Sequence, residues 1–312
     1  MSDFVVLLLG VGCAGFGGEL FVRGAVGLAH WLRISPGIIG ATVAAFATSS
    51  PELSISLNAA TAGHPQIALG DAIGSNVVNI ALILGLALLV AGIQCPRSSI
   101  KRDFPVALLA PLLTAAFALD GELSRIDGLL MLAMFLAWIT ATAIEARKQR
   151  SLAEKVLGEH RKGVVLLSCF AGLALLIGAG ALIVAGATGL ATAFGINQFI
   201  IGATIVAIGS STPELATTIV AGVRGHSEVS LGTILGSNIF NGLLVVALAA
   251  TIHPIAITWQ EVGVTLMFGL AALICAFPAR DGFIERRRAG LLLAIYIAYL
   301  ATLLQLHPIL NG

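Results

Sequence analysis

The chain has 312 residues, of which 58% are hydrophobic and only 11% are charged, and its mean hydropathy is +1.00. A soluble domain carries about 25% charged residues, so this composition excludes an ordinary soluble protein and indicates a bilayer environment. The formal net charge of +1 says nothing about partners. Four cysteines are scattered through apolar segments without metal-ligand or paired spacing, which is typical of small core residues.

Polar interruptions divide the sequence into ten apolar stretches of the kind that cross a bilayer as helices of about 20 residues. In chain order they lie at 4–30, 36–60, 67–93, 104–119, 126–145, 164–193, 197–222, 228–251, 259–277 and 289–306. Only helices or a closed barrel satisfy backbone polar groups in lipid, and these runs lack the alternation of a barrel. The expected fold class is all-α: a polytopic membrane protein with ten transmembrane helices.

The placement of Lys and Arg predicts the orientation of these helices. Of the 17 such residues, 15 fall on one side of the predicted membrane and Arg125 alone falls on the other. The positive-inside rule then places the loop 147–163 in the cytoplasm and both termini outside. No basic region precedes the first apolar run, which opens with Met1, Ser2 and Asp3, so we expect a retained helix and not a cleaved signal.

The chain contains an internal repeat. Segment 40–80 aligns without a gap with segment 202–242, at an offset of 162 residues, and 17 of the 41 positions are identical. The matches include Glu, Pro, Ser and Asn, which shared hydrophobicity does not explain. Because each half holds five predicted helices, the second half enters the membrane with inverted topology, as in alternating-access transporters. The predicted units are a first five-helix repeat at 1–146, a basic cytoplasmic loop at 147–163 and a second, inverted repeat at 164–312.

Each copy of the repeat carries a proline inside an apolar stretch. Pro51 has no N–H to donate to the carbonyl of Ala47, and Pro213 likewise has none to donate to the carbonyl of Gly209. Carbonyls freed at membrane depth must find partners in protein, water or an ion. Oxygen-bearing side chains lie within a turn of these breaks, or share a face of the following helix at i, i+4: Thr48, Ser49, Glu52, Ser75 and Asn79 in one copy, and Ser210, Ser211, Glu214, Ser237 and Asn241 in the other.

Carboxylates, amides, hydroxyls and carbonyls are hard oxygen donors. They suit Ca²⁺ or Na⁺ and argue against zinc or copper, since the repeated intramembrane residues include no thiolate or imidazole. A buried carboxylate at the bilayer centre costs about 2.5–3.5 kcal/mol even on the mild insertion scale. One divalent cation, two monovalent cations or two protons neutralise Glu52 and Glu214. The pair therefore favours a site of cation competition, and the ligand set leaves protons open as competitors.

Ordinary structural roles compete with this interpretation. Pro51 with Glu52, and Pro213 with Glu214, also resemble helix starts with a capping hydroxyl and an acid in the first turn. Two such starts inside apolar stretches, each followed at the same distance by GSNxxN, favour a functional site. Ser75, Asn76, Ser237 and Asn238 are alternatively interhelical hydrogen-bonding groups. Glu19 and Arg23, at i, i+4, predict an internal ion pair and not an ion ligand.

The segments "ATSSPE … GDAIGSNVVN" and "GSSTPE … GTILGSNIFN" resemble the two alpha repeats of the cation/calcium exchanger superfamily, in its prokaryotic sodium/calcium exchanger branch. The resemblance covers essentially the whole chain. It implies that Glu52 and Glu214 are the central ligands shared by Ca²⁺ and Na⁺. It further implies supporting ligands at Ser49, Ser211, Asn79 and Asn241, and flanking Na⁺ positions lined by the carbonyls of Ala45, Thr48, Ala207 and Ser210 and the hydroxyls of Ser75 and Ser237. Helices 1 and 6 would slide across a static core.

Some positions depart from the family's usual pattern. Where relatives often have Asn before the GSN element, this chain has Asp71 in one copy and Thr233 in the other. Asp71 lies at i, i+4, i+8 with Ser75 and Asn79 and adds a carboxylate towards the outer mouth. Some relatives carry Asp where this chain has Asn241, a position linked in the family with potassium dependence, so Asn241 favours potassium-independent exchange.

The leading hypothesis is a secondary antiporter of a prokaryotic inner (plasma) membrane that exchanges Ca²⁺ for Na⁺ at the paired glutamates by alternating access. It has no cofactor, since Ca²⁺ and Na⁺ are its substrates, and its other expected partner is the lipid bilayer. No nucleic acid or obligate protein partner is expected. A proton/Ca²⁺ antiporter of the same fold is the alternative, and an intramembrane hydrolase with a carboxylate dyad is a distant one.

Overall fold

In the computed structural model, the described residues are 3–61, 63, 65–152, 162–193, 207–257 and 259–306. Helices occur at each predicted stretch, although the first part of the 197–222 stretch and the loop residues 153–161 lie outside the described part. Half of the helical stretches are subdivided. Short π-helical or 3-10 turns, labelled η, interrupt the α-helices within a single stretch.

The first half begins with one long helix and ends with another. Its elements are α1 (Asp3–Leu32); α2 (Pro36–Ile39), η1 (Gly40–Ala44), α3 (Ala45–Thr48) and α4 (Ser50–Thr61); α5 (Pro65–Val77), η2 (Val78–Leu84) and α6 (Gly85–Val90); β1 (Ile93–Gln94); η3 (Ser99–Asp103), α7 (Phe104–Phe117) and η4 (Ala118–Asp120); β2 (Glu122–Leu123); and α8 (Arg125–Leu152).

The second half follows the same order. Its elements are α9 (Lys162–Ala193); α11 (Ala207–Ser210) and α12 (Thr212–Val223); α13 (Ser227–Ile239), η6 (Phe240–Val245) and α14 (Val246–Ile252); β3 (Ile255–Ala256); α15 (Trp259–Ala276); β4 (Phe283–Ile284); and α16 (Arg288–Leu306).

Four continuous helical stretches of the described residues are long and apolar enough to cross a membrane: Ala68–Val90, Ser99–Asp120, Arg125–Lys148 and Ser227–Ile252. Pro36–Thr48 and Ser50–Thr61 meet this test together, as a pair bent by 46°. The total of ten crossings stays a prediction.

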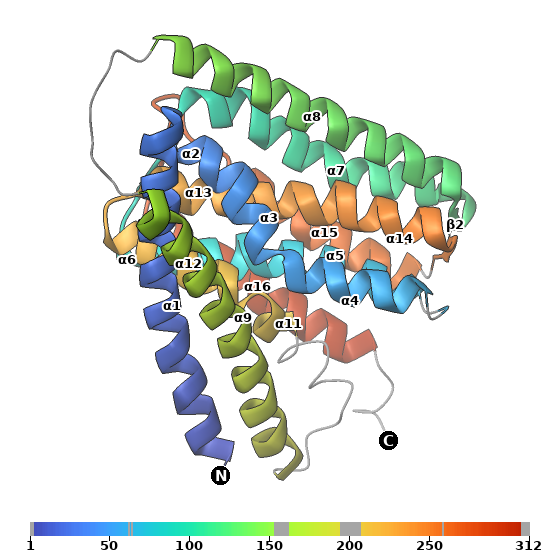
Figure 1. The fold of residues 1–312 in the computed structure, drawn as a ribbon. Helices are drawn as coiled ribbons and strands as arrows, with labels where there is room; N and C mark the ends of the chain where they lie inside the picture. Colours follow the sequence, from blue (N-terminus) through green and yellow to red (C-terminus); the bar gives the residue numbers. More distant parts are fainter. Residues whose placement is uncertain are drawn as a thin grey trace.

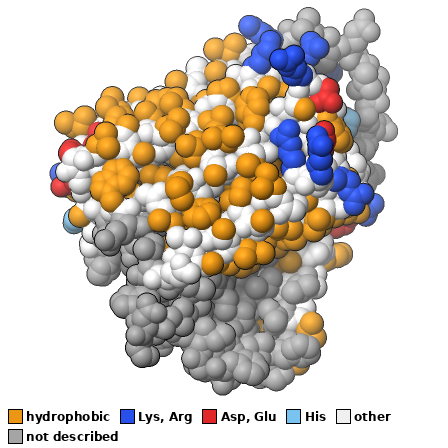
Figure 2. Space-filling model, turned by 180° about the vertical axis from the view of Figure 1, so that it is seen from behind, with side chains coloured by type: hydrophobic (Ala, Val, Ile, Leu, Met, Phe, Trp, Pro, Cys, Tyr) orange, Lys and Arg blue, Asp and Glu red, His pale blue; other side chains and the backbone are white. Residues whose placement is uncertain are grey.

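The outer surface of the helical bundle is apolar over a wide area. Figure 2 shows hydrophobic side chains across one face, with Lys and Arg gathered at one end of it. Exposed large side chains on α7, α8, α15 and α16 include Leu112, Leu129, Leu136, Met267, Ile274, Leu291 and Ile297. Such a continuous apolar exterior is what lipid requires of a membrane protein.

Helices α1 and α9 lie side by side and are steeply inclined to α7, α8 and α14 (Figure 1). Glycines allow their backbones to approach closely. A Cβ atom at Gly172 would lie 2.5 Å from the backbone N of Phe21, and one at Gly24 would lie 2.6 Å from the backbone N of Cys169. Small residues at a helix–helix interface are the usual means of packing within a membrane, where apolar burial gives little net attraction.

Helix α13 occupies the centre of the molecule, and its residues from Val229 to Ile239 are all buried. One of its faces packs against α2 and η1 through glycines. A Cβ atom at Gly232 would lie 2.5 Å from the carbonyl O of Gly37, and one at Gly236 would lie 2.4 Å from that of Ala41. These contacts leave no room for side chains, so they fix the rotation of α13 about its own axis.

Two short antiparallel pairs of strands join the halves at the loops. Strand β1 pairs with β4, with Ile93 opposite Ile284, and β2 pairs with β3, with Leu123 opposite Ile255. The backbone N–H of Cys95 extends the first pair by donating to the carbonyl of Gly282 at 2.8 Å. Burial raises the pKa of the Cys95 thiol to about 12, although Arg288 opposes this shift, so the reactive thiolate is scarce at neutral pH.

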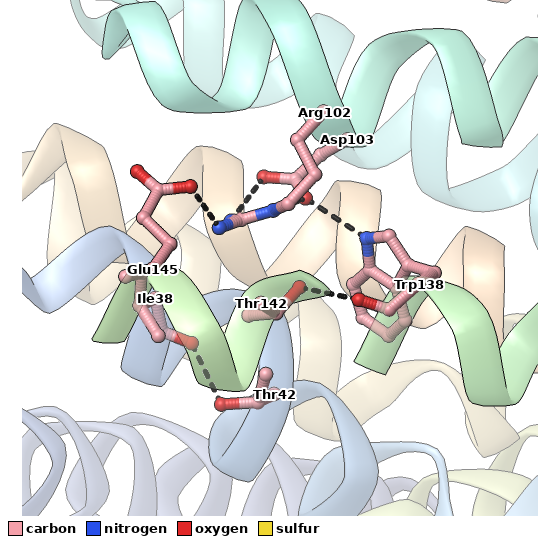
Figure 3. Close-up of polar contacts among 7 residues, drawn as sticks. All are labelled: Ile38, Thr42, Arg102, Asp103, Trp138, Thr142 and Glu145. Carbon is pink, nitrogen blue, oxygen red and sulfur yellow. Dashed lines mark hydrogen bonds and ion pairs between the residues drawn. The ribbon is translucent and has the colours of Figure 1, made fainter. Parts of the chain in front are cut away.

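A buried polar cluster ties the start of α7 to α8 (Figure 3). The Arg102 guanidinium lies between two carboxylates and donates to Asp103 at 2.8 and 3.0 Å and to Glu145 at 2.7 Å. The indole N–H of Trp138 donates to the same Asp103 carboxylate at 3.0 Å. Asp103 is fully buried, and these bonds supply the compensation that a buried charge needs.

Candidate ion-binding site

The two predicted helix breaks fall at Ser49 and Ser211. Ser49 separates α3 from α4 with φ −86° and ψ 9°, and Ser211 separates α11 from α12 with φ −84° and ψ 11°. The matching dihedral angles show that the two copies of the repeat break in the same way. Each break is followed by a proline in the first turn of the next helix, as the sequence predicts.

The carbonyl that Pro51 leaves without its helical donor has a partner in the protein. The hydroxyl of Ser50 donates to the carbonyl of Ala47 at 2.8 Å. In the other copy, the hydroxyl of Thr212 donates to the carbonyl of Ile208 at 3.2 Å. In the first copy, therefore, the side chain before the proline satisfies the freed carbonyl, and this carbonyl does not need an ion.

The paired glutamates lie against the opposite breaks. The hydroxyl of Ser49 donates to Oε1 of Glu214 at 2.8 Å, and the hydroxyl of Ser211 donates to Oε1 of Glu52 at 3.3 Å. Ser237 donates to the same oxygen of Glu214 at 3.2 Å. Both glutamates are 0% exposed. Residues that are more than 150 positions apart in the chain thus form one buried cluster.

Several buried polar atoms of the predicted site residues have no hydrogen-bond partner among the described residues. They are Oε2 of Glu52 and of Glu214, the hydroxyl of Ser75, and both amide atoms of Asn79 and of Asn241. Leaving a buried polar group unpaired costs about 1–3 kcal/mol. Buried polar groups of native structures are normally paired, and ordered water or an ion could pair with these atoms. Carboxylate, amide and hydroxyl oxygens suit Ca²⁺ and Na⁺.

Both asparagines stand in π-helical turns. Asn79 is in η2 and Asn241 is in η6, the second residue of each turn. Single π-helical turns within α-helices are frequently found at functional sites, because they change the direction of side chains. Within the described part of the chain, no three His, Cys, Asp or Glu side chains gather as a metal cluster. The predicted ligands of the candidate site therefore remain the two glutamates with neutral oxygen donors.

The remaining predicted ligands also lie at the breaks. Thr48 is buried, and its hydroxyl donates at 3.3 Å to the carbonyl of Ala45, which also accepts the backbone N–H of Ser49 at 2.9 Å. Ser210 is buried and is the last residue of α11, and Ala207 is the first. The side chain of Asp71 has one unpartnered buried oxygen and lies within Coulombic range of both glutamates.

The predicted ion pair between Glu19 and Arg23 is confirmed, with 2.5 Å between the Arg23 Nε and a carboxylate oxygen. The sequence analysis missed a second partner, because it joins distant elements. Arg224, directly after α12, donates to the two oxygens of Glu19 at 2.6 and 2.9 Å. Three further buried hydroxyls were also missed, those of Thr217, Thr218 and Ser230, which accompany the already noted Thr233. The helical spacing of Ser230, Thr233 and Ser237 was a signal that would have indicated them.

Comparison with protein families gives a match over most of the chain. The family described as sodium/calcium exchanger protein matches twice, at residues 2–143 and at 164–305. The chain belongs to the sodium/calcium exchanger family. The exchanger is 36% identical to the inner membrane protein YrbG of Escherichia coli, over 98% of both chains. It is 27% identical to the sodium/calcium exchanger MaX1 of Methanosarcina acetivorans, over 96% of this chain and 98% of the relative.

A solved structure agrees with these relatives. The sodium-calcium exchanger NCX_Mj, soaked with 10 mM Na⁺ and 10 mM Sr²⁺, superposes with a TM-score of 0.82 and 30% identity, over 96% of this chain and 97% of that one. The resemblance to the prokaryotic branch is thereby confirmed. As a family member, the exchanger is a helical membrane antiporter and not an enzyme, and it needs no cofactor because the transported ions are its substrates.

Proposed function

We propose that the exchanger moves Ca²⁺ against Na⁺ by binding them alternately at Glu52 and Glu214. The main support is the buried cluster. In it, one oxygen of each glutamate accepts a hydrogen bond from a serine hydroxyl at the opposite break, and the other oxygen has no partner among the described residues. Two carboxylates match the charge of one Ca²⁺ or of two Na⁺. The two ions therefore compete for the same oxygens, and such competition is the physical basis of exchange.

An inverted repeat accounts for the crossed contacts. A two-fold axis between segments 40–80 and 202–242 would turn the Ser49–Glu214 contact into the Ser211–Glu52 contact, and both are present. The equivalent dihedral angles at the two breaks support the same axis. Under this proposal, units 1–146 and 164–312 are the two halves, and each supplies one glutamate to a shared site.

The basic residues support the proposed orientation. Lys and Arg gather at one end of the apolar surface in Figure 2, and the ion-paired Arg102 belongs to the predicted cytoplasmic loops. The positive-inside rule assigns this end to the cytoplasm, which leaves both termini outside. The Na⁺ gradient of a cell, directed inward, would then drive Ca²⁺ outward.

The test is Ca²⁺ uptake into proteoliposomes of the purified exchanger. An outward Na⁺ gradient is compared with an outward proton gradient at matched membrane voltage. We expect the Na⁺ gradient alone to drive uptake; uptake driven by the proton gradient alone would replace Na⁺ with H⁺ as the coupling ion. Glu52→Gln and Glu214→Gln should each lower uptake about tenfold or more, since each removes a charged ligand. Exposed Glu122→Gln is the control, and normal uptake by both site variants would overturn the site.

A further inference from the structure

Four buried hydroxyls lie outside the glutamate cluster and lack partners. Thr217 and Thr218 of α12 and Ser230 and Thr233 of α13 are each 0% exposed, and none of their hydroxyls has a hydrogen-bond partner among the described residues. Buried threonines elsewhere in the chain behave differently. Thr114 and Thr142 donate to the carbonyl one turn earlier, at 3.1 and 2.9 Å. Among the described residues, the buried hydroxyls that lack a partner are these four and that of the predicted site residue Ser75.

Two contacts at the ends fix how α12 and α13 face each other. Near one end, the hydroxyl of Ser237 donates to Glu214. Near the other end, Ala221 packs with Val229 in one apolar cluster. The helices are antiparallel because a tight turn joins them, in which Gly225 has φ +78°. The residues between these two contacts on the two helices must therefore lie opposite one another.

The unpartnered hydroxyls fall in this interval and on the facing sides. On α12, Thr217 and Thr218 follow Glu214 at i+3 and i+4 and share its side of the helix. On α13, Ser230 and Thr233 precede Ser237 by seven and four residues, which also places them on one side. The glycines that pack α13 against α2 and η1 each precede Thr233 or Ser237 by one position, so they lie about 100° away round the helix. The bond from Ser237 to Glu214 turns the hydroxyl side towards α12.

We call these four hydroxyls, on α12 and α13, the hydroxyl row. The related positions of the first repeat copy do not form such a row. Thr217, Thr218, Ser230 and Thr233 correspond to Ile55, Ser56, Ala68 and Asp71 at the offset of 162. Ser56 donates at 3.4 Å to the carbonyl of Ala68, so its hydroxyl is satisfied. Shared ancestry of the two copies therefore does not explain the four hydroxyls, and this asymmetry favours a role on one side of the site.

The chemistry of these hydroxyls suits the transit of cations and not their tight binding. Four neutral oxygens replace part of the hydration shell of a cation, but they lack the carboxylates that hold Ca²⁺ tightly. Conduction needs contacts favourable enough for an ion to enter and weak enough for it to leave. An unpartnered hydroxyl is unfavourable in a dry interior, so the four hydroxyls call for water.

We propose that Thr217, Thr218, Ser230 and Thr233 line a water-containing passage through which cations travel between Glu214 and the membrane side on which Arg224 lies. The passage extends the proposed function and rests on it. All four side chains are fully buried in this structure, so the passage is closed to bulk water here. Alternating access requires such closure on one side of the site at a time.

The first test replaces hydroxyls by methyl groups of the same shape. Thr218→Val and Thr233→Val, singly and together, should slow Ca²⁺ uptake about tenfold, a factor that corresponds to the loss of one oxygen contact to an ion in transit. The matched controls are Thr114→Val and Thr142→Val, whose hydroxyls have partners. Raised thermal stability with normal uptake in the passage variants would overturn the passage, because it would show that the hydroxyls merely line a dry gap.

The second test measures access without transport. Cysteine is placed at Ser230 or Thr233 in a variant whose four native cysteines are replaced and which retains uptake, and a charged, membrane-impermeant thiol reagent is added to one side of the vesicles. We expect labelling from the Arg224 side only. Leu235→Cys is the control, since Leu235 is equally buried on α13. Labelling no faster than at Leu235 overturns the passage, whereas failure of the proposed function would appear separately, as no Ca²⁺ uptake by the unsubstituted protein.

Discussion

Asn76 and Asn238 hold each other by reciprocal hydrogen bonds. The side-chain amide of Asn76 donates to the backbone carbonyl of Asn238 at 3.2 Å, and that of Asn238 donates to the carbonyl of Asn76 at 3.3 Å. The two residues are 162 positions apart, which is the offset of the sequence repeat. This pair joins α5 to α13 beside the glutamate cluster, and it agrees with the interhelical role that the sequence left open for both residues.

Breaking this pair of hydrogen bonds should lower the stability of the fold more than the rate of transport. Asn76→Ala removes one donor and leaves the carbonyl of the buried Asn238 without it, so we expect a loss of about 1–3 kcal/mol in the free energy of unfolding. Asn238→Ala should have a similar effect. Thermal unfolding of the purified protein in detergent measures the loss. If the double variant loses less than the sum of the two single losses, the two bonds are coupled; a stability equal to that of the parent would contradict the structural role.

The two cross-repeat serine contacts predict unequal effects on Ca²⁺ binding. Ser49 donates to Glu214 at 2.8 Å, whereas Ser211 donates to Glu52 at 3.3 Å. The shorter bond orients its carboxylate more strongly, so Ser49→Ala should raise the half-saturating Ca²⁺ concentration more than Ser211→Ala. The initial uptake rate at graded Ca²⁺ concentrations gives the comparison. Ser56→Ala is a matched control, and equal shifts for the two site variants would remove the predicted asymmetry.

Much of this arrangement follows from local sequence. Long apolar runs indicate the helices, and the prolines at 51 and 213 locate the breaks to within two residues of Ser49 and Ser211. The repeat offset and the polar matches select the residues that meet at the centre. Each of these signals lies within one helix or in the comparison of two segments, so the amino-acid sequence alone is enough to detect them.

Other features depend on contacts that no local pattern encodes. The partner of the Ala47 carbonyl is a hydroxyl three residues away, and helical periodicity does not say which rotamer Ser50 adopts. The bond from Arg224 to Glu19 joins the end of α12 to α1. Helical spacing in the sequence aligns the hydroxyls of α13 with one another, but only the register of the two antiparallel helices sets them opposite those of α12. Packing and rotation of helices, not their positions in the sequence, decide these features.

Asp71 should adjust the balance between divalent and monovalent ions. Its carboxylate is within Coulombic range of Glu52 and Glu214, and a negative charge attracts Ca²⁺ twice as strongly as Na⁺ at the same distance. Asp71→Asn should therefore raise the half-saturating concentration of Ca²⁺ more than that of Na⁺. Competition of Na⁺ against Ca²⁺ uptake measures both, with exposed Asp120→Asn as the control. An equal change for the two ions would show that the carboxylate acts through structure and not through charge.

The ion pair between Glu19 and Arg224 should affect the rate of exchange more than the stability of the fold. It joins α1 to the residue after α12, and the Arg224 side chain is 53% exposed, so its contribution to stability is about 0.2–1 kcal/mol. The family resemblance implies that the first helix slides over the core, and the pair would then have to break in each cycle. Glu19→Gln and Arg224→Gln should therefore speed saturated exchange by a similar factor. Because either change removes the same contact, the double variant should be no faster than the single ones. Fully additive effects in this cycle, or a slower rate in both single variants, would show that the pair does not restrain α1.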